Sequence, residues 1–182
     1  MTREGALLVM IGVTVVLLGL GVLAWRRRTR RDSGLLAPVG ELPQGATSTL
    51  TASGFYVATT RHGEALERLA IAGLGFRSRV DVTVTDAGVA LDLVGQPRMT
   101  LALDRIEAAT LATVAIDRVV EPGGLVCVTW RARRSDGTDE LVDSYLRPQD
   151  ASARAVTDAI AATLPAAPTP DSATASTTGT DA

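Results

Sequence analysis

The sequence predicts a mainly β fold, in which a small antiparallel barrel carries a C-terminal α-helix and is preceded by one transmembrane helix. Three patterns support this prediction. An uncharged run near the N-terminus has the length of a bilayer span, apolar and polar residues then alternate in successive short segments, and an amphipathic segment comes last. Period-two alternation is typical of half-buried strands, whereas apolar residues three to four positions apart are typical of helices.

The predicted transmembrane helix covers residues 5 to 25 and follows a short external N-terminus of residues 1 to 4. Its 21 residues include no charged side chain. As a helix it would be about 31 Å long, close to the roughly 30 Å thickness of the hydrocarbon core. A cleaved secretory signal is the alternative, but arginines stand where a cleavage site would need small residues.

A block of basic residues predicts the orientation of this span. It follows the span directly and consists of Arg26, Arg27, Arg28, Arg30 and Arg31. Because basic residues accumulate on the cytoplasmic side, we expect a single-pass protein of the cell membrane with its N-terminus outside and its C-terminal domain in the cytoplasm. The same arginines are candidates for contact with anionic lipid headgroups.

Two further features surround the span. Glycines recur every seven residues and would share one helix face, as a helix–helix contact requires; they are Gly5, Gly12 and Gly19. The basic block and the aperiodic stretch after it, which contains prolines and glycines, are together predicted to be a juxtamembrane linker of residues 26 to 47.

The cytoplasmic domain is predicted to cover residues 48 to 164 and to begin with four strands. Residues 50 to 60 form the first, and a meander of three strands follows, with turn sequences between them. The apolar residues of the meander stand at alternate positions: Val80, Val82 and Val84, then Val89, Leu91 and Leu93, then Met99, Leu101 and Leu103. Residues 64 to 70 are a candidate short helix between the first two strands.

Three more strands complete the predicted barrel. Residues 106 to 116 form the fifth, with a short helix as the alternative interpretation, and Pro122-Gly123-Gly124 ends it. The sixth strand places Val126, Val128 and Trp130 on one face and Cys127 on the other. After a turn at residues 135 to 138, residues 141 to 146 form the seventh.

A helix is predicted to end the domain. Pro148 suits its first position, and Asp150 complements the dipole of the first turn. Its apolar stripe is formed by Ala153, Val156, Ile160 and Leu164, and Pro165 ends it. Residues 165 to 182 are rich in Ala, Thr, Ser, Pro and Asp and are predicted to be disordered.

Four strands, three strands and one helix, in this order, are the plan of a pleckstrin-homology-like (PH-like) barrel. Two short antiparallel sheets then pack nearly orthogonally, and the helix covers one open end. Another small β-barrel and an α+β sandwich are the alternatives.

Three stretches of the sequence carry a resemblance to a known family: residues 54 to 60 (GFYVATT), 66 to 68 (LER) and 73 to 77 (GLGFR). They are similar to an actinobacterial family of small proteins with one N-terminal span and a bacterial PH-like domain, often labelled membrane, export or transporter proteins. The resemblance implies a PH-like fold and a membrane location, and no catalytic residues. All 18 basic residues are arginine, which agrees with a high-GC genome.

Charge and cysteine content exclude some classes of function. The net charge is −2, and residues 48 to 164 contain 12 arginines against 15 acidic residues, which excludes an electrostatic nucleic-acid interface. The chain has one cysteine, so it forms no intramolecular disulfide.

Few residues are candidates for a site. Arg77 and Arg79 match a basic pair that clasps lipid phosphates in some PH domains, but we favour solvated or structural arginines. His62 is interpreted as a surface residue and Cys127 as a small buried residue, because neither has catalytic partners in the sequence pattern. The acidic cluster of the last hairpin is interpreted as a solvated edge-strand face; it consists of Asp139, Glu140 and Asp143.

From these features we expect a membrane-anchored, non-enzymatic interaction or scaffold module that presents a PH-like domain at the cytoplasmic face. Its partner would be a protein or a neighbouring copy. An accessory subunit of a transport or export complex and an anionic-lipid-sensing domain are the alternatives. One span encloses no transport pathway, so transport would require partners. No cofactor, metal or small-molecule substrate is predicted, because no phosphate-cradling, nucleophile or metal-ligand motif is present.

Overall fold

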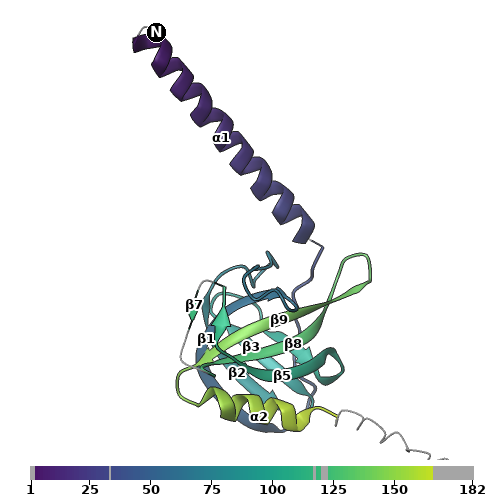
Figure 1. Ribbon diagram of the computed structural model, residues 1–182. Helices are drawn as coiled ribbons and strands as arrows, with labels where there is room; N and C mark the ends of the chain where they lie inside the picture. Colours follow the sequence, from purple (N-terminus) through teal and green to yellow (C-terminus); the bar gives the residue numbers. More distant parts are fainter. Residues whose placement is uncertain (1–2, 33, 117, 120–122, 166–182) are drawn as a thin grey trace, which may run out of the picture.

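The computed structural model describes residues 3–32, 34–116, 118–119 and 123–165. A long helix, α1 (Arg3–Asp32), leads to a β-rich domain that ends in a second helix, α2 (Ala153–Thr163). The two helices lie at opposite ends of the domain (Figure 1). The described part of the domain confirms the predicted mainly β plan, with a seven-stranded antiparallel sheet followed by a C-terminal helix.

The main sheet has the strand order β4-β3-β2-β1-β9-β8-β5. Its strands are β1 (Ser48–Arg61), β2 (Ser78–Thr85), β3 (Gly88–Leu93), β4 (Met99–Ala102), β5 (Ile106–Ala112), β8 (Leu125–Arg133) and β9 (Asp139–Pro148). A 3-10 turn, η1 (Leu103–Arg105), connects β4 to β5, and a separate small hairpin is formed by β6 (Val114–Ala115) and β7 (Arg118–Val119). Leu103 therefore belongs to a turn rather than to the predicted strand, whereas the strand interpretation of the fifth element is correct over β5.

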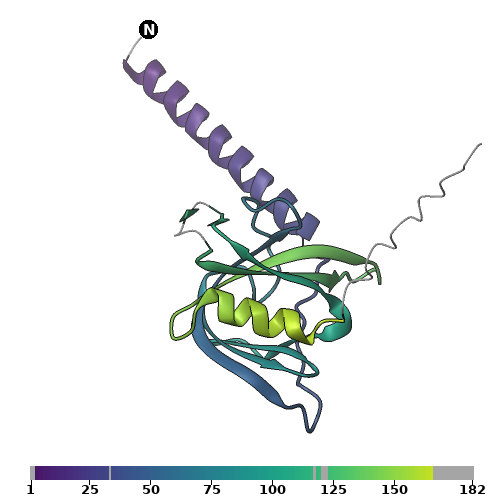
Figure 2. The same ribbon diagram turned by 60° about the horizontal axis from the view of Figure 1, so that its bottom comes forward.

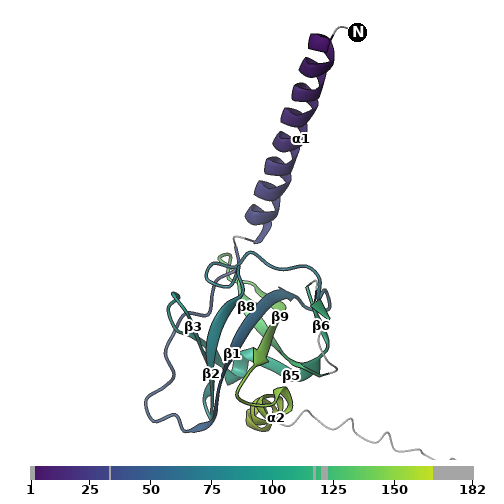
Figure 3. The same ribbon diagram turned by 90° about the vertical axis from the view of Figure 1, so that its left-hand side faces the viewer.

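Strand β1 joins the two halves of the sheet, because its first half pairs with β2 and its second half pairs with β9. Gly54 lies at the crossover. A Cβ atom at this position would collide with the carbonyl oxygen of Arg147 and lie 2.8 Å from the Cα of Pro148. Only glycine permits this close approach. The register of the β1–β9 pair then shifts after Tyr56, and the sheet curls into a barrel (Figure 3).

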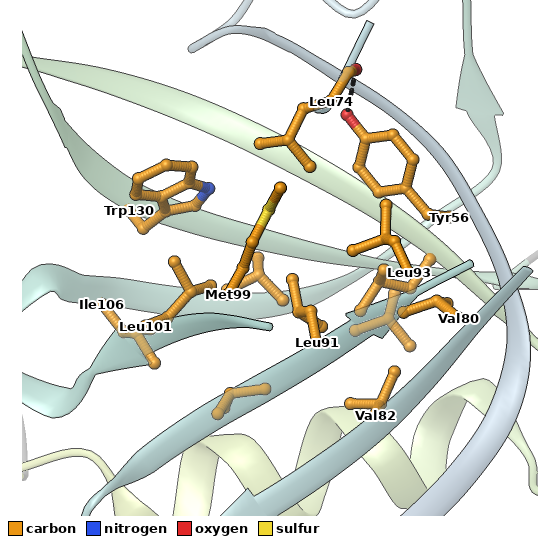
Figure 4. Packing of buried hydrophobic residues seen from close by; sticks show 14 of the residues in the cluster. Tyr56, Leu74, Val80, Val82, Leu91, Leu93, Met99, Leu101, Ile106 and Trp130 are labelled. Carbon is orange, nitrogen blue, oxygen red and sulfur yellow. Dashed lines mark hydrogen bonds between the residues drawn. The ribbon is translucent and has the colours of Figure 1, made fainter. Parts of the chain in front are cut away.

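The core fills the inside of this barrel (Figure 4). The alternating residues of the β2–β4 meander are buried as predicted, and so are Val126, Val128 and Trp130 of β8. The prediction did not include a third contribution, which comes from the loop between β1 and β2. Its Leu69, Ile71 and Leu74 are no more than 1% exposed.

A chain of hydrogen bonds connects four buried polar side chains across the core. Trp130 Nε1 donates to Ser144 Oγ at 2.9 Å, and Ser144 Oγ lies 2.7 Å from Thr59 Oγ1. Thr59 Oγ1 lies 2.9 Å from Tyr56 Oη, which donates to the carbonyl oxygen of Leu74 at 2.8 Å. Burial raises the pKa of Tyr56 far above its usual range, so its hydroxyl stays protonated. The chain fixes the β1–β2 loop to three strands.

Helix α2 begins later than predicted. Its N-cap is Ser152, whose Oγ accepts a hydrogen bond from the backbone N–H of Ala155 at 3.1 Å. Pro148 is instead the last residue of β9, and the carboxylate of Asp150 accepts a hydrogen bond from the backbone N–H of Ser53 at 2.8 Å. The predicted first turn is therefore wrong, because these residues still bind to β1.

The predicted apolar stripe of α2 is correct. Val156 and Ile160 are completely buried, while Ala153 and Leu164 pack partly buried against the core. The helix lies across one open end of the barrel and packs on β5 and β8 (Figure 2). Residues 166 to 182, where disorder was predicted, lie outside the described residues.

The candidate helix over residues 64 to 70 is not formed; these residues make turns and an extended stretch. Arg68 forms an isolated β-bridge with Thr60, and the backbone N–H of Leu69 donates to the carbonyl of Thr59 at 2.8 Å. These pairings continue the sheet beyond β1. Residues that pair with β1 in this way do not form a local helix.

Part of the predicted linker packs on the domain. The segment from Gly34 to Glu41, here called the strap, runs beside the β4 edge of the sheet. Leu35 is 3% exposed and belongs to the main core. The carbonyl of Pro38 accepts a hydrogen bond from the backbone N–H of Thr100 at 2.7 Å. Because burial and backbone pairing fix these residues, they are not a free tether.

Helix α1 is continuous over 30 residues and points away from the domain (Figure 1). Its large apolar side chains from Leu7 to Leu23 are at least 50% exposed where they are described. Among the described residues, however, no helix combines the length and the apolarity that a membrane crossing requires. The prediction that residues 5 to 25 form a transmembrane helix is therefore not confirmed.

Candidate functional site

The loop between β1 and β2, residues 62 to 77, forms a fixed wall at the barrel end opposite α2. It is held from beneath by its three buried apolar residues and by Arg68. The Arg68 guanidinium donates hydrogen bonds to the carbonyl of Val57 at 2.8 Å and to that of Gly75 at 3.2 Å. A long side chain thus ties the returning half of the loop to β1.

A cavity of about 740 Å³ opens beside this wall, lined by residues of the loop and of the β3–β4 turn. Gly73, one of its lining residues, is in the left-handed region, with φ of 79°. A Cβ at Gly73 would lie 2.7 Å from Met99 Cε and 2.9 Å from Gln96 Oε1. The glycine therefore lets the loop approach the β3–β4 turn closely. Phe76 and Val94 contribute exposed apolar lining, which suits an apolar occupant.

Large apolar side chains are exposed on this loop and on the β3–β4 turn. Phe76 is 87% exposed, and Leu66 and Val94 are each 70% exposed. Phe76 and Val94 line the cavity, and Leu66 lines a separate hollow of the same loop. We call these three residues the loop face. Apolar side chains grouped in this way are typical of surfaces that bind another molecule.

The two arginines proposed for phosphate binding lie at the edge of the loop face. The guanidinium carbon of Arg77 lies 4.6 Å from the centroid of the Phe55 ring, a cation–π contact. Arg79 on β2 pairs across the strands with Phe55 and is exposed. Neither arginine forms an ion pair with an acidic residue in the described chain. Phosphate binding by these arginines stays a prediction.

A second polar cluster lies on the outer surface of the β1–β9–β8 half. Asp143 is only 5% exposed. Its Oδ1 lies 2.9 Å from His62 Nδ1 and accepts a hydrogen bond from Thr129 Oγ1 at 2.7 Å. Its Oδ2 accepts one from the backbone N–H of Gly63 at 3.2 Å. The carboxylate therefore anchors the start of the β1–β2 loop.

This cluster corrects the interpretation of the acidic residues as an edge-strand face. Strand β9 lies between β1 and β8, so it is an inner strand. Asp143 is buried, whereas Glu140 forms ion pairs with Arg61 at 3.0 Å and with Arg134 at 2.7 Å. Asp139 binds Arg133 at 2.7 Å. The acidic residues therefore hold strands and turns together.

The remaining candidates are His62 and Cys127. The side chain of His62 is 54% exposed and is oriented by Asp143. Cys127 is buried, and burial, followed by the nearby Asp143 carboxylate, raises the pKa of its thiol to about 11. A thiol with so high a pKa is a poor nucleophile near neutral pH. No group of three potential metal ligands occurs in the described part of the chain.

The architecture agrees with the comparison to known families. A family described as bacterial PH domain-like matches residues 35–162. The chain belongs to this family. No curated protein matches the chain.

The family match fits the described PH-like domain. It begins at Leu35, the buried residue of the strap, and so includes 13 residues before the predicted start at residue 48. It ends at residue 162, one residue before Thr163, which is the last residue of α2. Sequence reasoning missed the strap because its apolar residues, interrupted by one proline and two glycines, show no periodicity; the signal was the pair Leu35-Leu36.

The sites predicted outside the PH-like domain lie on α1. The basic block occupies its last turns, where Arg26 and Arg27 are exposed and the side chains of the other three arginines are outside the described set. Gly12 and Gly19 have open space where a Cβ would lie. A shallow hollow occurs on the opposite helix face, lined by Thr14, Leu17, Leu18, Gly21 and Val22. The helix thus has two faces of low relief.

Proposed function

We propose that this protein is a membrane-anchored, non-enzymatic interaction module that holds its PH-like domain at the cytoplasmic face of the cell membrane. The observation that carries the proposal is the apolar surface of α1, which is exposed on every side. The family membership supports a binding or scaffold role for the domain. The resemblance to actinobacterial single-span proteins supports the membrane location.

Helix α1 needs apolar surroundings. A helix that is apolar on all sides belongs in a protein core or in a bilayer. Side chains such as Met10, 68% exposed, and Leu18, 65% exposed, point away from the axis in different directions and have no core around them. The uncharged run of the sequence also includes Ala6, Leu8 and Trp25, whose side chains are outside the described set.

The energetics of this run favour insertion into a bilayer. The run contains 12 residues of Val, Ile or Leu. At 0.3 to 0.6 kcal/mol for each, they would favour insertion by about 4 to 7 kcal/mol. The arginine block in the last turns of α1 supports a cytoplasmic position for the domain.

The polar groups of the domain support a binding role over catalysis. The histidine, the buried carboxylate and the cysteine each serve a structural contact, whereas the loop face and its cavity are open. Anchoring would keep this surface near other membrane proteins and raise its effective concentration toward them. The partner would be a protein or a second copy of the chain.

Fractionation of cells that produce the full-length protein tests the anchor. We expect the protein to remain in the membrane pellet after washing at alkaline pH, and the domain to be digested by protease only in inside-out vesicles. A variant with Leu17→Arg and Leu18→Arg is the control, because two charges in mid-span should release the protein. Recovery of the unmodified protein in the soluble fraction would refute the anchor.

The low-relief faces of α1 favour one second candidate, an accessory subunit of a membrane transport or export complex. Small residues on a membrane helix permit close contact with other helices. Gly21→Leu would fill the hollow beside Thr14 and should abolish cross-linking of α1 to a multi-span partner. Unchanged cross-linking, or cross-links to soluble proteins alone, would exclude this role.

A further inference from the structure

We propose that the loop face (Leu66, Phe76 and Val94) sits in the headgroup region of the membrane that holds α1. The domain would then rest on the bilayer surface in one orientation, with α2 directed toward the cytoplasm. This inference depends on the proposed anchor, because a domain free in solution has no bilayer beside it. The recognised chemistry is a lipid surface.

The strap places the exit of α1 at the same end of the domain as the loop face. Leu36 N–H donates to the carbonyl of Arg133 at 2.8 Å, so the strap begins beside the β8–β9 turn. At that end of the sheet, Arg61 pairs with Val142, and the β1–β2 loop starts directly after Arg61. Figures 1 and 3 show this loop and the end of α1 on the same side, with α2 opposite.

The connection between anchor and barrel is short. One residue separates Asp32, the last residue of α1, from Gly34, the first residue of the strap. From Trp25 to Asp32 the chain is helical and rises about 10 Å, and two further residues add at most about 7 Å. Because the buried Leu35 fixes the strap, the loop end of the barrel lies close to the headgroups whatever the tilt of α1.

The loop face has the composition of an interfacial contact. Surfaces that lie in the membrane interface present residues such as Phe and Leu, with basic residues beside them. Phe76 is the most exposed large apolar side chain in the described part of the domain, at 87%. At the other end, α2 directs its apolar side chains into the barrel and presents exposed residues such as Arg154 to solvent.

The neighbouring arginines indicate that this contact is mainly apolar. The guanidinium of Arg77 stacks on the ring of Phe55 and is partly satisfied there. Arg77 and Arg79 can reach phosphate groups at the edge of the contact, but Phe76 and its neighbours enter the interface first. We therefore expect only a weak dependence on the charge of the lipid.

The test uses full-length protein with an environment-sensitive fluorophore on one introduced cysteine. Leu66→Cys and Val94→Cys report on the loop face, and Ala155→Cys, at an exposed position of α2, is the matched control. The unmodified protein measures background labelling, which should be low because Cys127 is buried. Each protein is reconstituted into vesicles of phosphatidylcholine alone or with one quarter phosphatidylglycerol, with and without lipid-attached quenchers.

We expect labels at positions 66 and 94 to emit at shorter wavelength and to be quenched in both kinds of vesicle, while the label at position 155 behaves as in water. Adding Phe76→Ser to the position-94 variant should reduce the quenching. Phe76 is too exposed for this change to unfold the domain, and circular dichroism would verify this.

Two results would overturn the inference. In the first, the labels at positions 66 and 94 stay as hydrated as the label at position 155. The loop face would then bind a protein partner rather than the lipid surface. Quenching only in the anionic vesicles would replace an apolar contact with an electrostatic one. In both cases the protein still resists alkaline washing. Loss of that resistance would instead refute the anchor, so the two failures are distinguishable.

Discussion

The indole N–H of Trp130 on β8 donates a hydrogen bond to the hydroxyl of Ser144 on β9, at 2.9 Å. Both residues are buried, at 1% and 2% exposure. The hydroxyl of Ser144 continues through Thr59 and Tyr56 to the backbone of the β1–β2 loop. The largest core side chain is thus connected to the wall of the candidate binding surface.

Replacing Ser144 with alanine should destabilise the domain. The change leaves the buried Trp130 N–H without an acceptor and interrupts the chain toward the loop, which costs about 1 to 3 kcal/mol. Urea unfolding followed by tryptophan fluorescence measures the loss. The matched control is Thr157→Val, because Thr157 Oγ1 is also buried but has no hydrogen-bond partner among the described residues. Equal losses in the two variants would show that the chain contributes nothing specific.

The alternation of apolar residues made the strands of the meander predictable. Val80, Val82 and Val84 are buried because a pleated strand directs every second side chain to the same face. The stripe of α2 was predictable for the corresponding helical reason. These patterns are local, so one sequence is enough to reveal them.

Features that depend on distant pairing were not predictable in the same way. Asp143 looks like a surface carboxylate in sequence, and it is buried only because β9 pairs with β1, about 80 positions earlier in the chain. Leu69, Ile71 and Leu74 lie in a loop with no period, and tertiary contacts decide their burial. The loop face was missed for the same reason, since an exposed Phe76 cannot be distinguished from a buried one by spacing.

Leu35 should behave as a core residue despite its place in a segment that looks like a linker. Leu35→Ala removes a side chain that is 3% exposed, and such changes cost about 2 to 5 kcal/mol. The adjacent Leu36→Ala is the control, because that side chain is 48% exposed and only its backbone binds Arg133. Chemical unfolding of both variants would give the difference. If the Leu35 variant is as stable as the Leu36 variant, the strap is a free tether and Leu35 is not a core residue.

Gly54 should not tolerate a side chain. Gly54→Ala places a methyl group against the carbonyl of Arg147 and the Cα of Pro148. Both are backbone atoms, so β1 and β9 must separate, at a cost of roughly 1 to 3 kcal/mol or more. Gly40→Ala is the control, because its Cβ would meet only the Cβ of Thr100, at 4.0 Å. The thermal midpoints of the two variants should therefore differ, with Gly54→Ala clearly lower.

The buried thiol of Cys127 predicts a loss of stability at high pH. Burial raises its pKa from a usual value of 9.0 to about 11 in the folded protein. Between these values the folded state retains a proton that the unfolded state has lost, so stability is complete below about pH 9 and falls as the pH rises toward 11.

Tyr145 should act in the same direction as Cys127 at higher pH, because burial raises the pKa of its hydroxyl to about 12. The comparison of urea midpoints at pH 8 and pH 10.5 should therefore show a drop for the unmodified protein and a smaller drop for Cys127→Ala, which lacks the thiol. Thiol labelling of the native protein at pH 8 should also be slow, and fast after unfolding. If the native thiol reacts as fast as the unfolded one, Cys127 ionises freely and the predicted pH dependence is wrong.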